Sequence, residues 1–309
     1  MNPAHSGVLI FSDILINMAK FIIGIDIGGS KINAVLMKDG RVFHRVKSPT
    51  PKSKKEFLEK LYSAVDHLIS AAGKENILGI GCGVGGALDI SKGVILSWSN
   101  MKFLAGFNIK SWLKKKFHCE VKIDNDARSF TRGEYLFGAG KGYKNIVGLT
   151  LGTGVGGGAV INGRVIYGAH GSAGELGHMI IQIKNQKSKI KNYDLEALTV
   201  KYMRNSKFPL IAEAYKTAKD KKIKEALLYF EENLGAGLAN IINILDPEAI
   251  IIGGGAAEAA KVFIPKIKKA ADKFIVSPAA RKNVKILTGK LGEDAGALGA
   301  AALFIENRI

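Results

Sequence analysis

The feature that most constrains this chain is a structural plan that occurs twice: an extended segment, a glycine loop, a second extended segment, a tight turn and a third extended segment. The extended segments of the first copy are Phe21–Ile27, Ile32–Met37 and Arg41–Val46. Those of the second copy are Ile146–Leu151, Ala159–Ile161 and Arg164–Tyr167. Their tight turns, Asp39-Gly40 and Asn162-Gly163, are strong hairpin signals between extended runs. Since one plan is repeated along the chain, we predict two domains of similar fold.

Each copy continues with helices and strands, which predicts an α/β fold. After the first copy, apolar spacing predicts a helix over Lys54–Ala72 and strands at Ile77–Val84 and Val121–Asp124. The elements expected after the second copy are helix Ile223–Leu245, strand Ala249–Ile252, helix Ala256–Ile275, strand Val284–Leu287 and helix Leu291–Phe304. With 309 residues, of which 47% are hydrophobic, the chain can build two cores of ordinary size.

The net charge of +18 does not by itself indicate a nucleic-acid partner. The lysines are scattered along expected helices, and the one tight run, Lys114–Lys116, has no aromatic residues interleaved with it. Nucleic-acid recognition usually needs a clustered patch, so we interpret the charge as solvated helical faces. Cys82 and Cys119 form no disulfide framework, and no apolar run reaches the roughly 18 residues of a membrane helix. We therefore expect a cytoplasmic protein without a membrane partner or a specific nucleic-acid partner.

The first glycine loop, residues 26–31, joins two expected strands. It is therefore neither a Rossmann fingerprint nor a Walker P-loop, both of which lead into a helix. Asp26, at the end of a strand, is well placed to hold Mg²⁺ through water, which is the usual mode for this ion. Backbone N–H groups, a hydroxyl and an ammonium could bind phosphate, and they belong to Gly28, Gly29, Ser30 and Lys31. The alternative is an ordinary hairpin turn with a solvated lysine.

The second copy has a matching glycine loop, which consists of Gly152, Thr153 and Gly154. Two such loops at equivalent points of a duplicated plan predict a nucleotide bound in a cleft between the domains, and the alternative is a glycine-rich β-bulge. A third cluster follows a later strand and opens a helix, and it consists of Gly253, Gly254 and Gly255. Glycines there let adenine and its ribose lie against the backbone, although a close strand-to-helix turn explains them equally well.

The segment Asp124-Asn125-Asp126 ends a strand and begins a helix. Asn and Asp are good N-caps, so capping is one explanation of these residues. One of Asn125 and Asp126 could cap the helix while the other reaches a substrate. A carboxylate within hydrogen-bond reach of a substrate hydroxyl can accept its proton during phosphoryl transfer.

The segment Gly171–His178 surrounds one carboxylate and one imidazole, Glu175 and His178, with three glycines. Glycine lets the backbone turn sharply and lets a ligand come close. A carboxylate only accepts hydrogen bonds, whereas a neutral imidazole offers one donor and one acceptor. The pair therefore suits either a polyhydroxylated small molecule or a metal, and the alternative is a tight turn with two solvated side chains.

These motifs, together with Leu291–Ala301 (LGEDAGALGAA), occur along the chain in the order seen in the ROK (repressor, ORF, kinase) family of sugar kinases. The chain resembles this family over roughly residues 20–305. The stretch Leu149–His178 looks like the family signature. The resemblance implies an α/β actin-like ATPase fold, with two similar ribonuclease-H-like domains around a cleft that holds the sugar. The expected domains are residues 20–126 with 293–309 and residues 127–292. Residues 1–19 are expected to be an N-terminal extension that is disordered or mis-started, and in the second case Met18 is the expected start and residues 1–17 precede it.

The resemblance also implies a function: ATP-dependent phosphorylation of a hexose, glucose or a related aldose, at its 6-hydroxyl. By position, Asp126 resembles the catalytic base, and the expected cofactors are ATP and Mg²⁺. The residues that match the family's sugar ligands are Asn100, Asn125, Glu175, His178 and Glu196. Gly85-Gly86 stands where the family usually has Pro-Gly, so the fit is looser there. The family further implies a homodimer.

The main departure from the family concerns zinc. Most members carry Cys-x-Cys-Gly-x-x-Gly-Cys soon after the His, which joins these cysteines in binding a structural zinc. Here the corresponding segment, Gln182–Asp194, contains no cysteine. A His without thiolate partners is a poor structural zinc site, so we predict no zinc and expect the loop to be held by other contacts or to be mobile.

Two other functions remain open from the sequence. A sugar-responsive transcriptional regulator of the same family would carry a helix-turn-helix domain, and we expect the roughly 20 residues before the first loop to be too few for one. A sensor or structural ATPase without sugar turnover would bind sugar or ATP and have no need of the candidate base.

Overall fold

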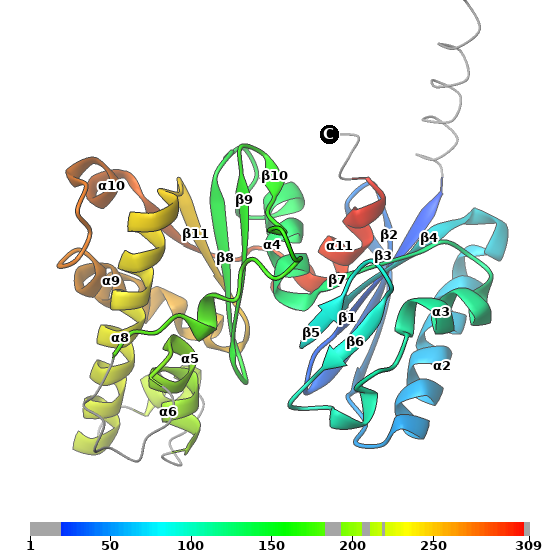
Figure 1. The fold of residues 1–309 in the computed structure, drawn as a ribbon, viewed down its shortest axis with the longest axis horizontal. Coiled ribbons are helices and arrows are strands. Elements are labelled where there is room, and N and C mark those ends of the chain that lie inside the picture. Colours follow the sequence, from blue (N-terminus) through cyan, green and yellow to red (C-terminus); the bar gives the residue numbers. More distant parts are fainter. Residues whose placement is uncertain (1–19, 183–192, 206–210, 218–219, 306–309) are drawn as a thin grey trace, which may run out of the picture. The chain divides into compact units, whose positions relative to one another are not determined.

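The computed structural model describes residues 20–182, 193–205, 211–217 and 220–305 (Figure 1). Contacts divide these residues into two compact units. The first contains the described residues up to Ser129 and those from Gly296 onward, and the second runs from Phe130 to Ala295. The expected extension, residues 1–19, lies outside the described residues. No helix in the described part of the chain is long and apolar enough to cross a membrane.

The first unit is built on a five-stranded sheet in the order β3-β2-β1-β4-β7. Its strands are β1 (Phe21–Ile27), β2 (Lys31–Lys38), β3 (Arg41–Pro49), β4 (Ile77–Val84) and β7 (Val121–Asn125). Strands β1, β2 and β3 pair antiparallel, whereas β4 lies parallel to β1 and β7 parallel to β4. The unit also contains the helices α2 (Lys54–Ala72) and α3 (Ile109–Phe117), the short turns η2 (Lys74–Asn76) and η3 (Lys102–Leu104), and the hairpin β5 (Ala87–Asp89) with β6 (Val94–Ser97).

The second unit repeats this sheet, in the order β10-β9-β8-β11-β12. Its strands are β8 (Ile146–Leu151), β9 (Val155–Ile161), β10 (Arg164–Val165), β11 (Ala249–Gly253) and β12 (Lys285–Thr288). The directions match as well, because β8, β9 and β10 pair antiparallel and β11 and β12 continue in parallel from β8. The predicted duplication is therefore confirmed, strand by strand.

Helices make up most of the rest of the second unit. They are η4 (Leu176–His178), α5 (Leu195–Leu198), α6 (Val200–Asn205), α7 (Ile211–Lys216), α8 (Lys221–Leu245), η5 (Gly255–Ala259), α9 (Ala260–Ala271) and α10 (Pro278–Asn283). The predicted helix Ala256–Ile275 is shorter than expected. Its first residues form η5, and the chain restarts as α10 after Ser277, whose hydroxyl caps the new helix and whose neighbour Pro278 suits a first helical turn.

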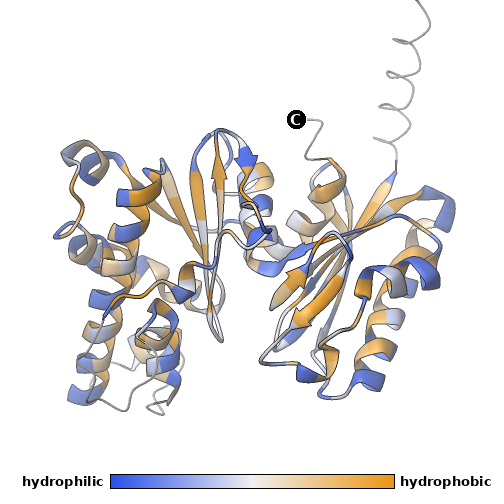
Figure 2. Ribbon diagram, in the orientation of Figure 1, coloured by the Kyte–Doolittle hydropathy of each residue, from blue (hydrophilic) through white to orange (hydrophobic). Residues whose placement is uncertain are grey.

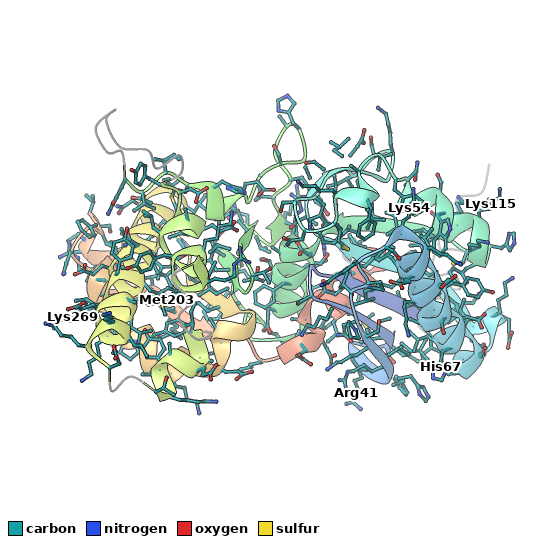
Figure 3. All side chains as sticks on the ribbon, turned by 90° about the horizontal axis from the view of Figure 1, so that it is seen from below. Arg41, Lys54, His67, Lys115, Met203 and Lys269 are labelled. Carbon is teal, nitrogen blue, oxygen red and sulfur yellow. The ribbon has the colours of Figure 1, made fainter. Side chains whose placement is uncertain are left out.

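Hydrophobic residues concentrate in the strands, and polar residues lie on the outer faces of the helices (Figure 2). In α2 the apolar positions Phe57, Leu61, Val65 and Leu68 are buried against the first sheet. Ser53 starts this helix by accepting a hydrogen bond from Glu56 N. Basic side chains such as Arg41, Lys115 and Lys269 are exposed and extend outward (Figure 3), as expected for solvated charge.

The helix that follows the last strand of each sheet belongs mainly to the other unit. Helix α4 (Asp126–Phe137) follows β7, but its residues from Phe130 onward belong to the second unit. A Cβ at Gly148 of β8 would collide with Thr131 of α4. Helix α11 (Ala295–Ala301) is extended by η6 (Gly292–Asp294) before it and η7 (Ala302–Phe304) after it. It follows β12 and belongs to the first unit from Gly296 on.

Glycines in the first sheet make room for α11. A Cβ at Gly24 of β1 would collide with the backbone carbonyl of Ala297, and one at Gly81 of β4 with that of Ala300. The two strands therefore accept the helix backbone at a distance that no larger residue allows. The sequence prediction of a single helix over Leu291–Phe304 has the right location, with a 3-10 turn at each end.

Candidate active site

The candidate residues of the first unit lie at the carboxyl edge of its parallel strands. This edge is formed by the ends of β1, β4 and β7, followed by residues 28–30, Gly85-Gly86 and Asp126. In open α/β sheets, ligands bind outside the carboxyl ends of the strands. The fold thus brings the predicted phosphate loop and the predicted base to one edge.

Asp26 has a strongly perturbed carboxyl group at this edge. Its side chain is partly accessible at the surface, but protein packs closely around the carboxyl group. Desolvation by burial, together with the smaller effect of the charge of Asp126 and against the opposing charge of Lys31, raises the pKa of Asp26 to about 7. A carboxylate that is costly to ionise alone becomes a good ligand when a cation supplies the opposing charge.

The position of Asp26 depends on Gly296, which sequence reasoning missed. Gly296 lies in α11, and a Cβ there would lie 2.6 Å from Asp26 Cγ. The residue is 270 positions away in sequence, so only the packing of α11 on the first sheet reveals the contact. Any side chain at Gly296 must move the carboxyl group of Asp26.

The first glycine loop is closed by its own backbone and by Thr50. Gly28 N donates to Lys31 O at 2.9 Å, and Thr50 Oγ1 donates to Gly28 O at 2.8 Å. Asn100 lies against this loop, because a Cβ at Gly29 would be 2.7 Å from Asn100 Nδ2. The structure thus places Asn100, which is predicted as a sugar ligand, beside the first glycine loop. Thr50 gave no signal in the sequence.

The junction of β7 and α4 separates the roles of its two polar residues. Asn125 Oδ1 accepts from Ala127 N at 3.0 Å and from Arg128 N at 3.1 Å, which makes Asn125 the cap of α4. Asp126 Oδ1 accepts from Ala127 N at 2.8 Å. Its other oxygen faces Gly85, where a Cβ would lie 3.1 Å from Oδ2. The side chain of Asn125 therefore caps the helix, and the carboxylate of Asp126 lies along the sheet edge.

The Gly85-Gly86 turn has a local structural reason. A Cβ at Gly85 would lie 2.6 Å from Cζ2 of Trp98, and Gly86 has a φ of 84°. The positive φ of Gly86 requires the glycine that the family also has there, and any side chain at Gly85, where the family has proline, would have to displace the indole. Trp98 thus fits the departure from the family's Pro-Gly pattern, and sequence reasoning did not single it out.

The second glycine loop is tied down by charged side chains. Glu196 Oε2 accepts from Val155 N at 2.7 Å, and Glu196 Oε1 lies 2.5 Å from Lys201 Nζ. Arg204 Nη1 donates to Thr153 O at 3.2 Å, and Gly152 N donates to Gly154 O at 3.0 Å. Both oxygens of Glu196, predicted as a sugar ligand, are therefore engaged in fixing the loop and its surroundings.

The segment that carries Glu175 and His178 packs on β9. Gly174 has a φ of 100° and its carbonyl lies against Gly157, while a Cβ at Gly177 would collide with Val155 O. These glycines allow two backbones to approach, so their first role is packing rather than ligand access. Glu175 and His178 themselves are exposed, and His178 Nδ1 lies 3.1 Å from Asp194 Oδ2. Asp194 was not predicted as a site residue.

The third glycine cluster is mostly structural. A Cβ at Gly253 would collide with Phe130, and Gly254 has a φ of 79° and contacts the backbone of Leu151. Only Gly255 has open space where a Cβ would be. Of the three residues predicted to lie beside adenosine, Gly253 is buried, whereas Gly254 and Gly255 are exposed at the surface.

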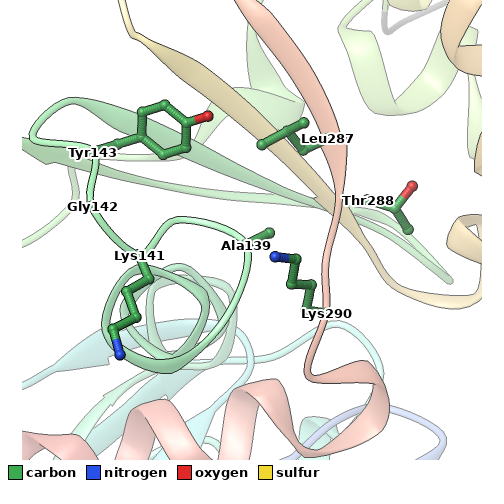
Figure 4. Close-up of a pocket in the computed structure, with 7 residues that line it drawn as sticks. All are labelled: Ala139, Lys141, Gly142, Tyr143, Leu287, Thr288 and Lys290. Atoms are coloured by element: carbon green, nitrogen blue, oxygen red, sulfur yellow. The ribbon is translucent and has the colours of Figure 1, made fainter.

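A pocket of about 420 Å³ lies elsewhere in the second unit, beside β12 (Figure 4). Its lining residues are Ala139, Lys141, Gly142, Tyr143, Leu287, Thr288 and Lys290. None of the predicted site residues is among them. Nearby, the buried carboxylate of Glu134 accepts hydrogen bonds from Ala139 N, Lys290 N and Leu291 N, which fixes the two segments that border the pocket.

Comparisons with known proteins identify the family of the chain. The model of the ROK family matches residues 22–307. The chain belongs to the ROK family. A glucokinase of Halalkalibacterium halodurans is 29% identical over 317 residues, which cover 92% of this chain and 94% of the glucokinase. A xylose repressor of Bacillus spizizenii is also 29% identical, over 94% of this chain and 78% of the repressor.

A solved ROK structure supports the same fold. The ROK family glucokinase from Streptomyces griseus, in complex with glucose and AMPPNP, superposes with a TM-score of 0.79 at 26% identity. The match covers 92% of this chain and 98% of the glucokinase chain. The ROK fold of this protein is therefore the actin-like ATPase fold, which the sequence resemblance implied.

Proposed function

We propose that the protein transfers the γ-phosphoryl group of ATP to the 6-hydroxyl of a hexose, glucose or a related aldose. The observation that carries the proposal is the placement of Asp126, on the first turn of α4, at the sheet edge that also bears Asp26 and the first glycine loop. Support comes from the ROK glucokinase relatives and from the neighbour that binds glucose and AMPPNP.

In this proposal each unit contributes a part of the chemistry. The backbone N–H groups of the two glycine loops bind phosphate, and Ser30 and Lys31 add a hydroxyl and a charge. Asp26 would hold Mg²⁺ through water, and the ion would neutralise charge on the transferred phosphoryl group. The raised pKa of Asp26 fits this role, since a nearby cation favours its ionised form.

Asp126 accepts the proton of the attacking hydroxyl as the bond to phosphorus forms. Asn100, Glu175 and His178 hold the other hydroxyls of the sugar. Asn125 fixes the start of α4, and Glu196 fixes the second glycine loop. Because positioning supplies much of the rate in phosphoryl transfer, these contacts matter as much as the base. We also propose a homodimer, which sedimentation equilibrium would test.

The direct test is a panel of hexoses and amino-hexoses with ATP and Mg²⁺, read as ADP release, for the natural protein and Asp126→Asn. We expect the substitution to lower kcat at least about 10²-fold, because general-base catalysis contributes about 10²–10⁴-fold. Asp39→Asn is the matched control, since it removes the same charge at an exposed hairpin turn. Undiminished turnover by Asp126→Asn would refute the role of the base.

A sugar-responsive regulator, or a non-catalytic protein that binds sugar or ATP, is the second candidate, and the match to xylose repressors favours it. The similarity spans nearly all of the related glucokinase but leaves about a fifth of the repressor unmatched. Absence of ADP release with every sugar, together with salt-sensitive and sequence-selective DNA binding, would support the regulator. Sugar binding by calorimetry without either activity would support a non-catalytic protein.

A further inference from the structure

The imidazole of His178 is held by the carboxylate of Asp194. Its Nδ1 lies 3.1 Å from Oδ2 of Asp194, sixteen residues further along. Asp194 is buried, whereas the side chain of His178 is 60% exposed. Nε2 makes no hydrogen bond to any residue that the structure describes. One ring nitrogen is therefore occupied inside the protein and the other is left for a ligand.

Asp194 is itself fixed from several directions. Its Oδ1 accepts from Ala197 N at 2.7 Å, which caps α5. The backbone around it pairs with the segment that follows His178, because Leu195 N donates to Met179 O at 2.9 Å and Asp194 forms a β-bridge with Ile180. The carboxylate thus presents Oδ2 to the imidazole in one direction.

The structural zinc that the family resemblance implies does not fit these residues. No three His, Cys, Asp or Glu side chains come together in the described ranges, and residues 183–192 contain none of these residue types in the sequence. Structural zinc sites need four ligands, mostly thiolates. Here Nδ1 of His178 lies against Asp194 instead. Backbone pairing of Met179 and Ile180 with Asp194 and Leu195 joins the two ends of the intervening segment.

The exchange of a metal for a carboxylate reverses the hydrogen bonding of the ring. A metal on Nδ1 leaves the proton on Nε2, which then donates. A carboxylate on Nδ1 draws the proton of the neutral ring to that nitrogen, so that Nε2 keeps a lone pair and accepts. With a metal on Nδ1, the histidine would thus donate to the oxygen of a sugar hydroxyl. With a carboxylate on Nδ1, it would accept the hydrogen of that hydroxyl.

We propose that Asp194 is a positioning residue that holds neutral His178 as the Nδ1–H tautomer, so that Nε2 accepts a hydrogen bond from one hydroxyl of the sugar. This inference rests on the proposed sugar kinase function for its ligand. It adds a rule of specificity: the hydroxyl that meets His178 must donate. A sugar with fluorine at that carbon cannot donate and loses the contact.

Asp194→Ser is the informative variant. Serine is a good N-cap, so the start of α5 is retained, but its side chain is too short to reach His178. In ¹⁵N-resolved imidazole spectra without sugar, we expect the Nδ1–H tautomer in the natural protein and a mixture of tautomers in the variant. A dominant Nε2–H tautomer in the natural protein would overturn the inference.

Kinetics separate positioning from stability. In Asp194→Ser we expect the sugar KM to rise by up to about 10-fold, with kcat within about 2-fold, because only the fraction of rings in the Nδ1–H tautomer can then accept from the sugar. In a His178→Gln background, Asp194→Ser should change KM no further. The unfolding temperature reports separately on the cap. An unchanged KM in Asp194→Ser, or an equal loss in both backgrounds, would contradict the positioning role.

A sugar series and a metal assay complete the test. Monodeoxyfluoro glucoses, each altered at a carbon other than C6, should include one whose KM rises in the natural protein but not further in His178→Gln. One zinc ion per chain, by elemental analysis of protein prepared without chelator, would overturn the exchange. If the natural protein phosphorylates no sugar, the proposed function fails, yet the tautomer still decides whether Asp194 fixes the ring.

Discussion

The two glycine loops occupy equivalent places in two sheets of the same topology, yet they are built differently. The residue before the last in β1 is Asp26, and its counterpart in β8 is Thr150. The first loop is held by a neutral hydroxyl, that of Thr50, and by packing on Asn100. The second is held by the charged side chains of Glu196 and Arg204.

This difference shows that equivalent positions of a duplicated fold can take different roles. In the first unit the hydrogen bonds that close the loop come from its own backbone and from Thr50, and the carboxyl group at the strand end lies near the charges of Lys31 and Asp126. In the second unit the nearby carboxylate of Glu196 is used for the loop backbone and for Lys201. We therefore expect substitutions at equivalent points to have unequal effects in the two units.

The largest effect is expected at Asp26. Its raised pKa means that folding favours the protonated form, so its contribution to stability falls as pH rises from about 4 to about 7 and is then level. A shift of about 3 pKa units at about 1.4 kcal/mol each sets an upper bound of about 4 kcal/mol. In urea unfolding, Asp26→Asn should therefore be more stable than the natural protein at pH 8, by up to this amount.

The gain of Asp26→Asn should shrink toward pH 4, where both forms are neutral in the folded state. Thr150→Val is the matched control, because it alters the counterpart position without a titrating group. A constant difference between Asp26→Asn and the natural protein across this pH range would show that the carboxyl group is not the cause. Mg²⁺ with nucleotide should stabilise the natural protein but not the Asn variant.

The next largest effect is expected at the glycines against which α11 and α4 pack, Gly24 of β1 and Gly148 of β8. Gly24→Ala would press on the carbonyl of Ala297, which is backbone, whereas Gly148→Ala would press on the side chain of Thr131. A backbone obstacle cannot rotate away. We expect Gly24→Ala to cost about 3 kcal/mol of unfolding free energy and Gly148→Ala about 1–2 kcal/mol, since overpacking typically costs 1–3 kcal/mol. Equal costs in chemical unfolding would mean that α11 moves as easily as a side chain.

A smaller effect is expected at the second loop. Glu196→Gln keeps the size of the side chain but removes the charge that faces Lys201 and Val155 N. We expect a loss of about 1–2 kcal/mol in unfolding free energy, because both partners are partly buried and hydrogen bonds to charged groups are worth about 1.5–3 kcal/mol. A sugar KM that rises with no change in stability would instead assign Glu196 to direct sugar binding.

The smallest effect concerns the first loop. Thr50→Val removes the hydroxyl that donates to Gly28 O but keeps the shape of the side chain. We expect about 1 kcal/mol or less in stability, the usual worth of a neutral hydrogen bond, and a rise in the KM for ATP. Thr50→Ser, which retains the donor, should restore the KM. Identical behaviour of the two variants would show that the hydroxyl does not shape the loop.

Local patterns predicted the strands and hairpins well, because each depends on alternation and turn residues within a few positions. Strand β9 is an instructive failure. It was expected only at Ala159–Ile161, since Gly156–Gly158 reads as loop, but it starts at Val155. The chain stays extended through these glycines because the Gly174–Gly177 segment packs on them.

The site was predictable only in part, for a similar reason. Motifs and resemblance drew attention to Asp26, Asn100 and Asp126, which one sheet edge and its loop bring together. Thr50, Gly296 and Asp194 act through contacts made by folding across long stretches of sequence, and no local pattern marks them. Their functional roles, like those of the predicted ligands, stay predictions until they are measured.

The exchange of terminal helices fixes the order in which the units can be finished during synthesis. The second unit is one continuous stretch, Phe130–Ala295, and all of it has been translated before the ribosome reaches Gly296. The first unit includes residues that precede the second unit, but it lacks the helix that covers Gly24 and Gly81 until residues 296–301 have emerged. Domains usually complete their folding from the amino terminus onward. Here the nascent chain must keep the first sheet partly uncovered until the residues from Gly296 onward have been translated.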